Sequence, residues 1–145
     1  MLFEAIALAC AALFAGAAVY ISVAEHPARL ECAPAVALAQ WRPSYQRATL
    51  MQAPLAVAGF GAAVIAYWQG RSVVVLFGGL LLGAVVPFTL FVIRPTNARL
   101  LDPSLDPSSI QVMELLRRWG TLHAVRTGAG VGAFVLQLVH AAARG

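Results

Sequence analysis

The chain alternates between long apolar runs and shorter polar stretches. Four apolar runs cover about residues 5–24, 48–68, 73–93 and 120–142. Because a helix rises about 1.5 Å per residue, roughly 20 residues cross the ~30 Å hydrocarbon layer of a bilayer. The pattern therefore predicts an all-α fold, a four-transmembrane-helix bundle formed by a single integral membrane domain over residues 1–145.

The connection after the first run is rich in proline. Pro27 should end or restart the first helix, and residues 34–41 should form a short interfacial helix that Pro43 stops. A cleaved signal peptide is the rival interpretation of the first run, because residues 22–24 resemble a small-residue cleavage site. The run carries Glu4 where a signal peptide has basic residues, which favours a retained helix.

The connection before the fourth run should also hold a short helix. Asp102 and Asp106 each precede a proline and indicate turns, and Asp106 is a suitable N-cap. Ile110, Met113 and Leu116 follow at helical spacing, which is typical of an amphipathic helix on the membrane surface. The expected fold is thus a four-helix bundle with short interfacial helices in its two longer loops.

Short turns and small residues constrain how the helices pack. Residues 69–72 leave room only for a tight turn, so the second and third helices should be antiparallel neighbours. Small residues let helices approach closely in a membrane, and they serve either internal packing or a homo-oligomer. Those within the third and fourth runs are Gly78, Gly79, Gly83, Gly128 and Gly132.

The composition lies outside the range of soluble domains. Its residues are 61% hydrophobic and 11% charged, whereas soluble domains are about a quarter charged. All ten basic residues are arginine, and the formal net charge is +4. No basic run interleaves with aromatic residues on a polar face, so we expect no nucleic-acid partner. The lipid bilayer is the expected partner.

The arginines also bear on orientation. The connections at residues 25–47 and 94–119 carry seven arginines, against one each in the short turn and the C-terminal tail. Cytoplasmic loops are enriched in basic residues. We therefore expect these two loops in the cytoplasm and both termini outside.

The two cysteines form no recognisable motif. Cys10 lies in the first apolar run and Cys32 in the loop after it, with no Cys-x-x-Cys pair and no metal-ligand spacing. This argues against the thiol–disulfide chemistry of four-helix membrane quinone reductases. Both are expected to be small buried or interfacial thiols.

The segment that opens the fourth run carries the candidate chemistry. On a helix Trp119, His123 and Arg126 fall at i, i+4 and i+7, so their side chains share one stripe. Ionisable groups inside a bilayer are costly and by default mark a functional site. His140, near the far end of the same run, is expected to be an interfacial residue.

The two halves of the chain echo one another. An Ala-Arg-Leu string follows the first run at residues 28–30 and the third run at residues 98–100. Trp41 with Tyr45 precedes the second run, as Trp119 with His123 precedes the fourth. Two parallel helix pairs related by an axis along the membrane normal would produce this pattern, with a site at their junction. Chance similarity in an Ala-, Arg- and Leu-rich chain is the alternative.

This arrangement would place His26 and His123 at the same membrane depth, among guanidinium and neutral polar groups. Arginine can fork onto an oxyanion without losing its own charge, so such a pocket suits an anionic or phenolic ligand. The residues expected to line it are Arg29, Arg94, Arg99, Arg126, Thr96, Asn97, Tyr45, Gln52, Trp119 and Glu25.

Three ordered strings resemble a known family. They are Tyr20 with residues 25–30 (Glu-His-Pro-Ala-Arg-Leu), residues 95–100 (Pro-Thr-Asn-x-Arg-Leu) and residues 119–126 (Trp-x-x-x-His-x-x-Arg). Together they are similar to the anthrone oxygenase-like membrane proteins over nearly the whole chain. The resemblance implies a four-helix integral membrane protein, expected in a bacterial inner membrane. Some members of that family oxidise anthrones to anthraquinones without an evident cofactor.

The resemblance leads us to expect an oxidase or oxygenase of a small phenolic or polyketide-like lipophilic substrate. It would use molecular oxygen as co-substrate and no bound cofactor. His123, ahead of His26, would remove an acidic C–H or O–H proton, since an unperturbed imidazole pKa of about 6.5 suits a base at neutral pH. Arg126 and Arg29 would stabilise the resulting enolate. These four residues are the catalytic candidates.

A metal-dependent oxygenase is a second interpretation. It would use two histidines and a carboxylate, drawn from His26, His123, Glu25 and either Glu31 or Glu114. The nearby arginines oppose a dication, and neither histidine is deep enough in the bilayer to ligate haem. No metal ligand is therefore expected.

A non-enzymatic scaffold or carrier is a third interpretation. Trp119, Arg126 and residues 94–99 would then hold an anionic lipid headgroup or a small molecule. Ion pairs from Glu25 or Glu31 to neighbouring arginines would make part of the cluster structural. What occupies the space between the helix pairs distinguishes these interpretations.

Overall fold

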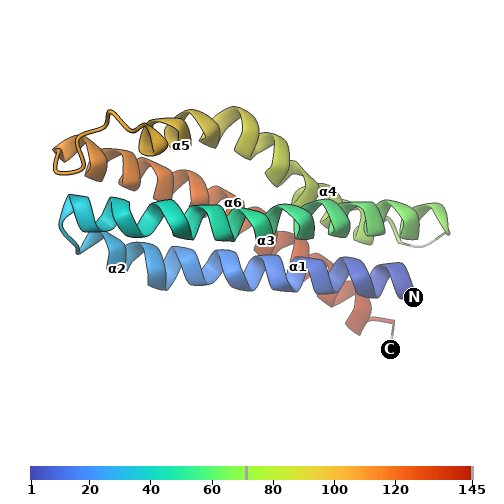
Figure 1. The fold of residues 1–145 in the computed structure, drawn as a ribbon. Coiled ribbons are helices and arrows are strands. Elements are labelled where there is room, and N and C mark those ends of the chain that lie inside the picture. Colours follow the sequence, from blue (N-terminus) through green and yellow to red (C-terminus); the bar gives the residue numbers. More distant parts are fainter. Residues whose placement is uncertain (71, 145) are drawn as a thin grey trace.

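The computed structural model describes residues 1–70 and 72–144 and contains only helices there (Figure 1). Two of them are π-helical turns, η1 and η2, that continue directly from an α-helix. In chain order the elements are α1 (Leu2–Tyr20), η1 (Ile21–Glu25), α2 (His26–Leu30), α3 (Pro34–Trp68), α4 (Val73–Phe88), η2 (Thr89–Ile93), α5 (Arg94–Leu101) and α6 (Ile110–Ala142).

Four continuous helical segments are long and apolar enough to cross a membrane. They run over Leu2–Leu30, Pro34–Trp68, Val73–Leu101 and Ile110–Ala142. At about 1.5 Å per residue, the longest extends roughly 52 Å, well beyond a ~30 Å hydrocarbon layer. The predicted all-α, four-transmembrane-helix integral membrane protein is confirmed, with helices that project past the bilayer core.

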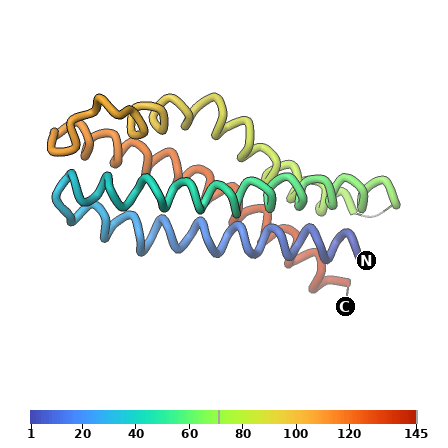
Figure 2. The backbone as a smooth tube through the Cα atoms, viewed as in Figure 1, coloured from blue at the N-terminus to red at the C-terminus, as the bar shows by residue number. Residues whose placement is uncertain are grey.

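The four segments pack as a ring of neighbours. α1 and α4 each pack beside α3 and α6, so α1 lies diagonally across from α4 and α3 across from α6. The two termini lie at one end of the bundle, and the two longer connections lie at the other (Figure 2). This arrangement brings α2, α5 and the start of α6 to the same end, as the sequence predicts.

The predicted interfacial helices are wrong. Pro43 and Pro54 lie inside the single helix α3, and residues 110–116 are the first turns of α6 rather than a separate surface helix. Both extensions bury apolar side chains against each other, among them Leu38, Trp41 and Leu116. Burial of these side chains outweighs the helix hydrogen bonds that the prolines remove, so the helices continue.

The π turns explain how the chain passes Pro27 and Pro95 without ending a helix. Proline clashes with the carbonyl group four residues earlier, which is Val23 or Phe91 here. Each of these residues lies in a π turn, η1 or η2, whose wider backbone accommodates a proline ring. Pro27 therefore does not end the helical segment, and it lies in the first turn of α2, where the α-helix starts again after the π turn.

The echo between the two halves of the sequence recurs in the structure. Each half consists of a helix, a π turn, a short helix that begins with proline at its second residue, and a long helix. Inserting one residue into an α-helix turns the following side chains by about 100°. The π turn η1 thus decides which face of α2 points into the bundle.

Close contacts between helices occur at particular small residues. A Cβ atom added at Gly79 of α4 would overlap the Cβ of Ala63 on α3, so these two antiparallel helices touch there. In α6 one such contact is at Gly130, where an added Cβ would lie 2.7 Å from Phe14 Cδ1. The two α6 glycines that the sequence pattern indicated, Gly128 and Gly132, have no neighbour within 3.5 Å of such an atom, so no close helix contact occurs there.

The turns have local hydrogen-bonded causes. Gly70, with φ of 75°, closes the predicted tight turn between α3 and α4, and Arg71 lies outside the described residues. Before α6, the Asp106 carboxylate accepts hydrogen bonds from the Ser108 hydroxyl and from the Ser108 backbone N–H. These bonds, the hydroxyl bond most, lower the pKa of Asp106 from its usual value. The predicted N-cap at Asp106 is wrong, because the helix begins at Ile110 after Ser109.

Candidate functional site

A polar and aromatic cluster lies inside the bundle at the end that carries the long connections. Its members come from four elements that the chain order separates widely. They are Ser22 on η1, His26 and Arg29 on α2, Trp41, Tyr45 and Gln52 on α3, and Trp119, His123, Arg126 and Thr127 on α6. Several of them line a small cavity with a volume of about 20 Å³, enough for one water molecule.

Trp119 is the centre of the cluster. Its ring stacks on His123 with centroids 4.8 Å apart, and it lies 5.1 Å from the tilted ring of His26. Trp41 meets it edge-on at 5.8 Å. The two histidines therefore contact the same indole, and the predicted convergence of His26 with His123 is found in the structure.

Arg29 is buried, and its guanidinium is held by a polar network that reaches the surface at Gln40. Its guanidinium donates to Glu25 Oε1 at 2.6 Å, to Gln40 Oε1 and to His26 Nδ1 at 3.0 Å. Glu25 also accepts from Gln40 Nε2 at 2.9 Å and from the Ser44 hydroxyl. The charge of Arg29 is thus matched by one carboxylate, and each of its three nitrogens donates one hydrogen bond within the protein.

The same network determines the tautomer of His26. Arginine is only a donor, so His26 Nδ1 must accept, and a neutral ring then carries its hydrogen on Nε2. That nitrogen is buried against the α6 backbone, close to Gly120. Both ring nitrogens of His26 are therefore directed at protein groups, which suits an anchoring role.

Gly120 leaves the space that His26 occupies. A Cβ added there would overlap His26 Nε2 and lie 2.6 Å from its Cδ2. We expect Gly120→Ala to lower the free energy of unfolding by about 1–3 kcal/mol, because the imidazole ring must move away from Trp119. Thermal unfolding of the detergent-purified variant measures this.

A matched control lies on the same helix. No atom lies within 4 Å of a Cβ added at Gly128, so Gly128→Ala should raise stability slightly through its helix propensity. Equal unfolding temperatures for the two variants would contradict the close packing of His26 on α6.

His123 is oriented by two hydroxyl groups. Its Nδ1 lies 3.1 Å from Ser22 Oγ and 3.4 Å from Thr127 Oγ1, and the two hydroxyls are 2.8 Å apart. Thr127 also contacts two backbone carbonyls, those of Ala18 and His123. Among residues 1–70 and 72–144, no group forms a hydrogen bond with the other ring nitrogen, Nε2.

One assignment of hydrogens satisfies these contacts together. His123 Nδ1–H donates to Ser22, Ser22 donates to Thr127, and Thr127 donates to a carbonyl. In the opposite direction Ser22 donates to His123, and the single Thr127 hydrogen then serves either Ser22 or a carbonyl, so one of these contacts lacks a hydrogen. The preferred tautomer therefore has its lone pair on Nε2, the nitrogen without a protein partner.

Arg126 lies beside His123 and has no carboxylate partner in the described part of the chain. Its Nη2 donates to Gln52 Oε1 at 3.0 Å, and its Cζ lies 5.7 Å from the Phe14 ring centroid. Its Nε is buried without a hydrogen-bond partner, as is Gln52 Nε2. Arg29 and Arg126 thus differ, because only Arg29 is neutralised within the protein.

The other predicted site residues are divided between the cluster and the surface. Asn97 Nδ2 donates to the Tyr45 hydroxyl at 3.2 Å, and Thr96 is buried next to it on α5. Arg94 and Arg99 are exposed on the opposite face of the same helix. The structure therefore does not bring these two arginines to the His123 cavity.

Sequence reasoning missed several members of the cluster. Ser22 is the one polar residue of the first apolar run, and Thr127 lies one helical turn after His123. Both facts are visible in the sequence and could have indicated partners for the imidazole. Gln40 and Ser44 carry no such signal, because they become partners of Glu25 only when α3 packs beside α2.

Within residues 1–70 and 72–144, no three His, Cys, Asp or Glu side chains are grouped so that they could hold a metal ion. The carboxylate considered as a ligand, Glu25, is instead hydrogen-bonded to Arg29, Gln40 and Ser44. Glu31 and Glu114 are exposed.

Comparison with known families covers most of this site. The family model described as Anthrone oxygenase matches residues 41–136, about two-thirds of the chain. The chain belongs to the anthrone oxygenase family. The match includes the α6 string with Trp119, His123 and Arg126, and it begins after His26 and Arg29. Searches of the curated proteins and of the solved structures find no match to the chain.

Proposed function

We propose that this member of the anthrone oxygenase family is a cofactor-independent oxygenase of small phenolic, lipophilic substrates. One observation supports it most. Arg126, a half-buried side chain whose Nε is fully buried and which has no carboxylate partner among the described residues, lies beside an imidazole whose Nε2 has no partner there. A base next to an unneutralised cation suits a reaction that creates negative charge on its substrate.

His123 acts as the base in this proposal. Ser22 and Thr127 hold its Nδ1 as a donor, so the lone pair of Nε2 is available for a substrate proton. His26 has no such lone pair, because its Nδ1 accepts from Arg29. The proposal therefore assigns proton transfer to His123 and the anchoring of Trp119 to His26.

Arg126 stabilises the anion that forms. Gln52 accepts from one of its terminal nitrogens and so orients the guanidinium, whereas the Nε hydrogen has no protein acceptor within the described residues. An enolate or phenolate oxygen would accept that hydrogen and neutralise the charge. A preorganised donor of this kind acts most strongly where the site excludes water.

The reaction converts a ring methylene into a carbonyl group and consumes one molecule of oxygen. His123 removes one C–H proton, and the resulting carbanion passes its electrons to oxygen as a C–O bond forms. The imidazolium returns the proton, which gives a hydroperoxide. Loss of the second C–H proton then forms the C=O bond and breaks the O–O bond, and hydroxide leaves with that proton as water.

The cavity limits how substrate binds. A space of about 20 Å³ admits one molecule of the size of water or oxygen. The rings of a tricyclic substrate do not fit beside it, so binding requires the lining side chains of α3, such as Tyr45 and Thr49, to move. Only the reacting edge of the substrate then reaches His123.

The test is turnover by purified protein in nanodiscs. We expect anthrone to be converted to anthraquinone with one oxygen molecule consumed per product, and with one atom of labelled oxygen incorporated into the carbonyl. The rate should be unchanged by metal chelators. No turnover above that of empty nanodiscs would overturn the proposal and leave the scaffold or carrier as the better interpretation.

A further inference from the structure

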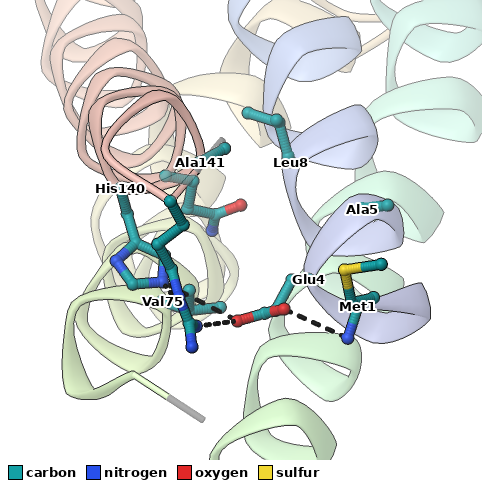
Figure 3. A pocket seen from close by; sticks show the side chains of 9 residues that line it. Met1, Glu4, Ala5, Leu8, Val75, His140 and Ala141 are labelled. Atoms are coloured by element: carbon teal, nitrogen blue, oxygen red, sulfur yellow. Dashed lines mark hydrogen bonds and ion pairs between the residues drawn. The ribbon is translucent and has the colours of Figure 1, made fainter.

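A second cavity lies at the opposite end of the bundle from the His123 cluster. It opens between the first turns of α1 and the last turns of α6, next to the start of α4 (Figure 3). Its volume is about 560 Å³, within the range of ~300–1,000 Å³ that small-molecule sites have. Apolar side chains from three helices line it, namely those of Ala5, Leu8, Val75 and Ala141.

Gln137 on α6 is the polar group inside this cavity. Its side chain lines the cavity and is only 2% exposed, and neither its Nε2 nor its Oε1 has a hydrogen-bond partner in the described part of the chain. An amide that is buried in apolar surroundings without partners is destabilising, and such groups in native proteins are rarely left unpaired.

The protein makes room for this amide. A Cβ added at Gly78 on α4 would lie 2.8 Å from Gln137 Cγ and 2.9 Å from its Nε2. Any larger residue at position 78 would therefore displace the side chain. The close approach of α4 keeps Gln137 at the cavity wall.

The charged groups of the cavity lie at its rim and pair with one another. Glu4 Oε1 accepts from Arg144 Nη1 at 3.0 Å and lies 3.7 Å from His140 Nε2 (Figure 3). Glu4 Oε2 lies 3.1 Å from the N-terminal ammonium of Met1, so the carboxylate pairs with two cations at the rim (Figure 3). The side chains deeper in the cavity are apolar apart from Gln137, and a neutral molecule fits that interior better than an ion.

We infer that this cavity binds a neutral, lipophilic molecule whose polar edge presents a hydrogen-bond donor beside an acceptor, as a lactam or a hydroxy ketone does. Both amide atoms are closed off in this structure, so the Gln137 side chain must turn toward the ligand on binding; its Nε2 then donates to the ligand's acceptor, and its Oε1 accepts from the ligand's donor. The apolar body of the ligand packs against Leu8 and Val75. The inference does not depend on the proposed oxygenase activity.

The probe is 2-quinolone, an aromatic lactam with N–H and C=O on one edge, titrated into protein in nanodiscs with empty nanodiscs as the blank. We expect saturable binding, and about tenfold weaker binding of N-methyl-2-quinolone, which keeps the acceptor and the apolar body but lacks the donor. Absence of saturable 2-quinolone binding would overturn the inference, and the cavity would then hold water alone.

Two variants locate the binding. Gln137→Leu should weaken 2-quinolone binding by about tenfold and abolish the preference over the methylated probe, whereas the same change at exposed Gln69 should alter neither. Ala141→Trp, which fills the cavity but keeps the amide, should remove binding as well. Unchanged affinity in folded Gln137→Leu protein would overturn the assignment of the amide.

Discussion

Replacement of His123 by alanine is expected to lower kcat for anthrone oxidation by about 10²–10⁴-fold, the usual contribution of a general base. The physical reason is that the other imidazole of the cluster, His26, cannot replace it as the base, since its Nδ1 accepts from Arg29. The measurement is oxygen uptake by nanodisc-embedded protein under saturating substrate. Size-exclusion chromatography establishes that the variant is folded.

The control for this variant is Thr121→Ala on the same helix. Thr121 is exposed, and its hydroxyl donates only to the carbonyl of Arg117 in its own helix. Its replacement should leave the rate unchanged. A folded His123→Ala protein that retains wild-type turnover would remove His123 from the role of base.

Replacement of Arg126 by methionine should lower kcat by about 10²–10³-fold, as loss of a donor to a developing oxyanion does. kcat/KM should fall by the same factor, because the interaction strengthens only as charge develops. The unfolding temperature should rise at the same time, because the variant no longer buries a guanidinium that lacks a carboxylate partner. Methionine keeps most of the volume of the side chain.

Opposite changes in activity and stability separate catalysis from structure at this position. If Arg126 only held the helices together, methionine would lower the unfolding temperature. The matched control is Arg99→Met, which makes the same change on the exposed face of α5 and should affect neither quantity. A comparable loss of activity in Arg99→Met would place the substrate outside the His123 cavity.

The two arginines of the cluster, Arg29 and Arg126, use the same side chain in different ways. Arg29 has Glu25, Gln40 and His26 as partners, so its charge and geometry are satisfied before any ligand binds. Arg126 has one neutral partner and a buried Nε without an acceptor. Burying an unmatched charge is costly, which is why a position that retains one is a candidate for binding an anion.

Much of the site could be predicted from residues close together in sequence. Trp119, His123 and Arg126 share a stripe because a helix repeats every 3.6 residues, and the structure keeps them together at the cavity. The convergence of His26 with His123 could be predicted because successive spans run in opposite directions. The connections after the first and third spans therefore lie at the same end of the bundle.

Other parts of the prediction failed for one physical reason. The face of α2 and of α5 that points into the bundle depends on the π turn before each helix. A single extra residue in a helical turn leaves no recognisable pattern in the local sequence. On α5 the resulting orientation buries Thr96 and Asn97 and exposes Arg94 and Arg99. The expected helix ends at prolines were also wrong, because packing between the extended helices outweighed the local preference of proline to end a helix.

From the sequence alone follow the four membrane spans, the membership in the anthrone oxygenase family and the polar stripe on α6, because hydrophobic periodicity and short motifs are local properties of a chain. The tertiary structure alone decides that Arg29 is neutralised while Arg126 is not, that Ser22 orients His123, and that Gly120 admits His26. These features join residues up to about a hundred positions apart, and only the packing of the four helices brings them within hydrogen-bonding distance.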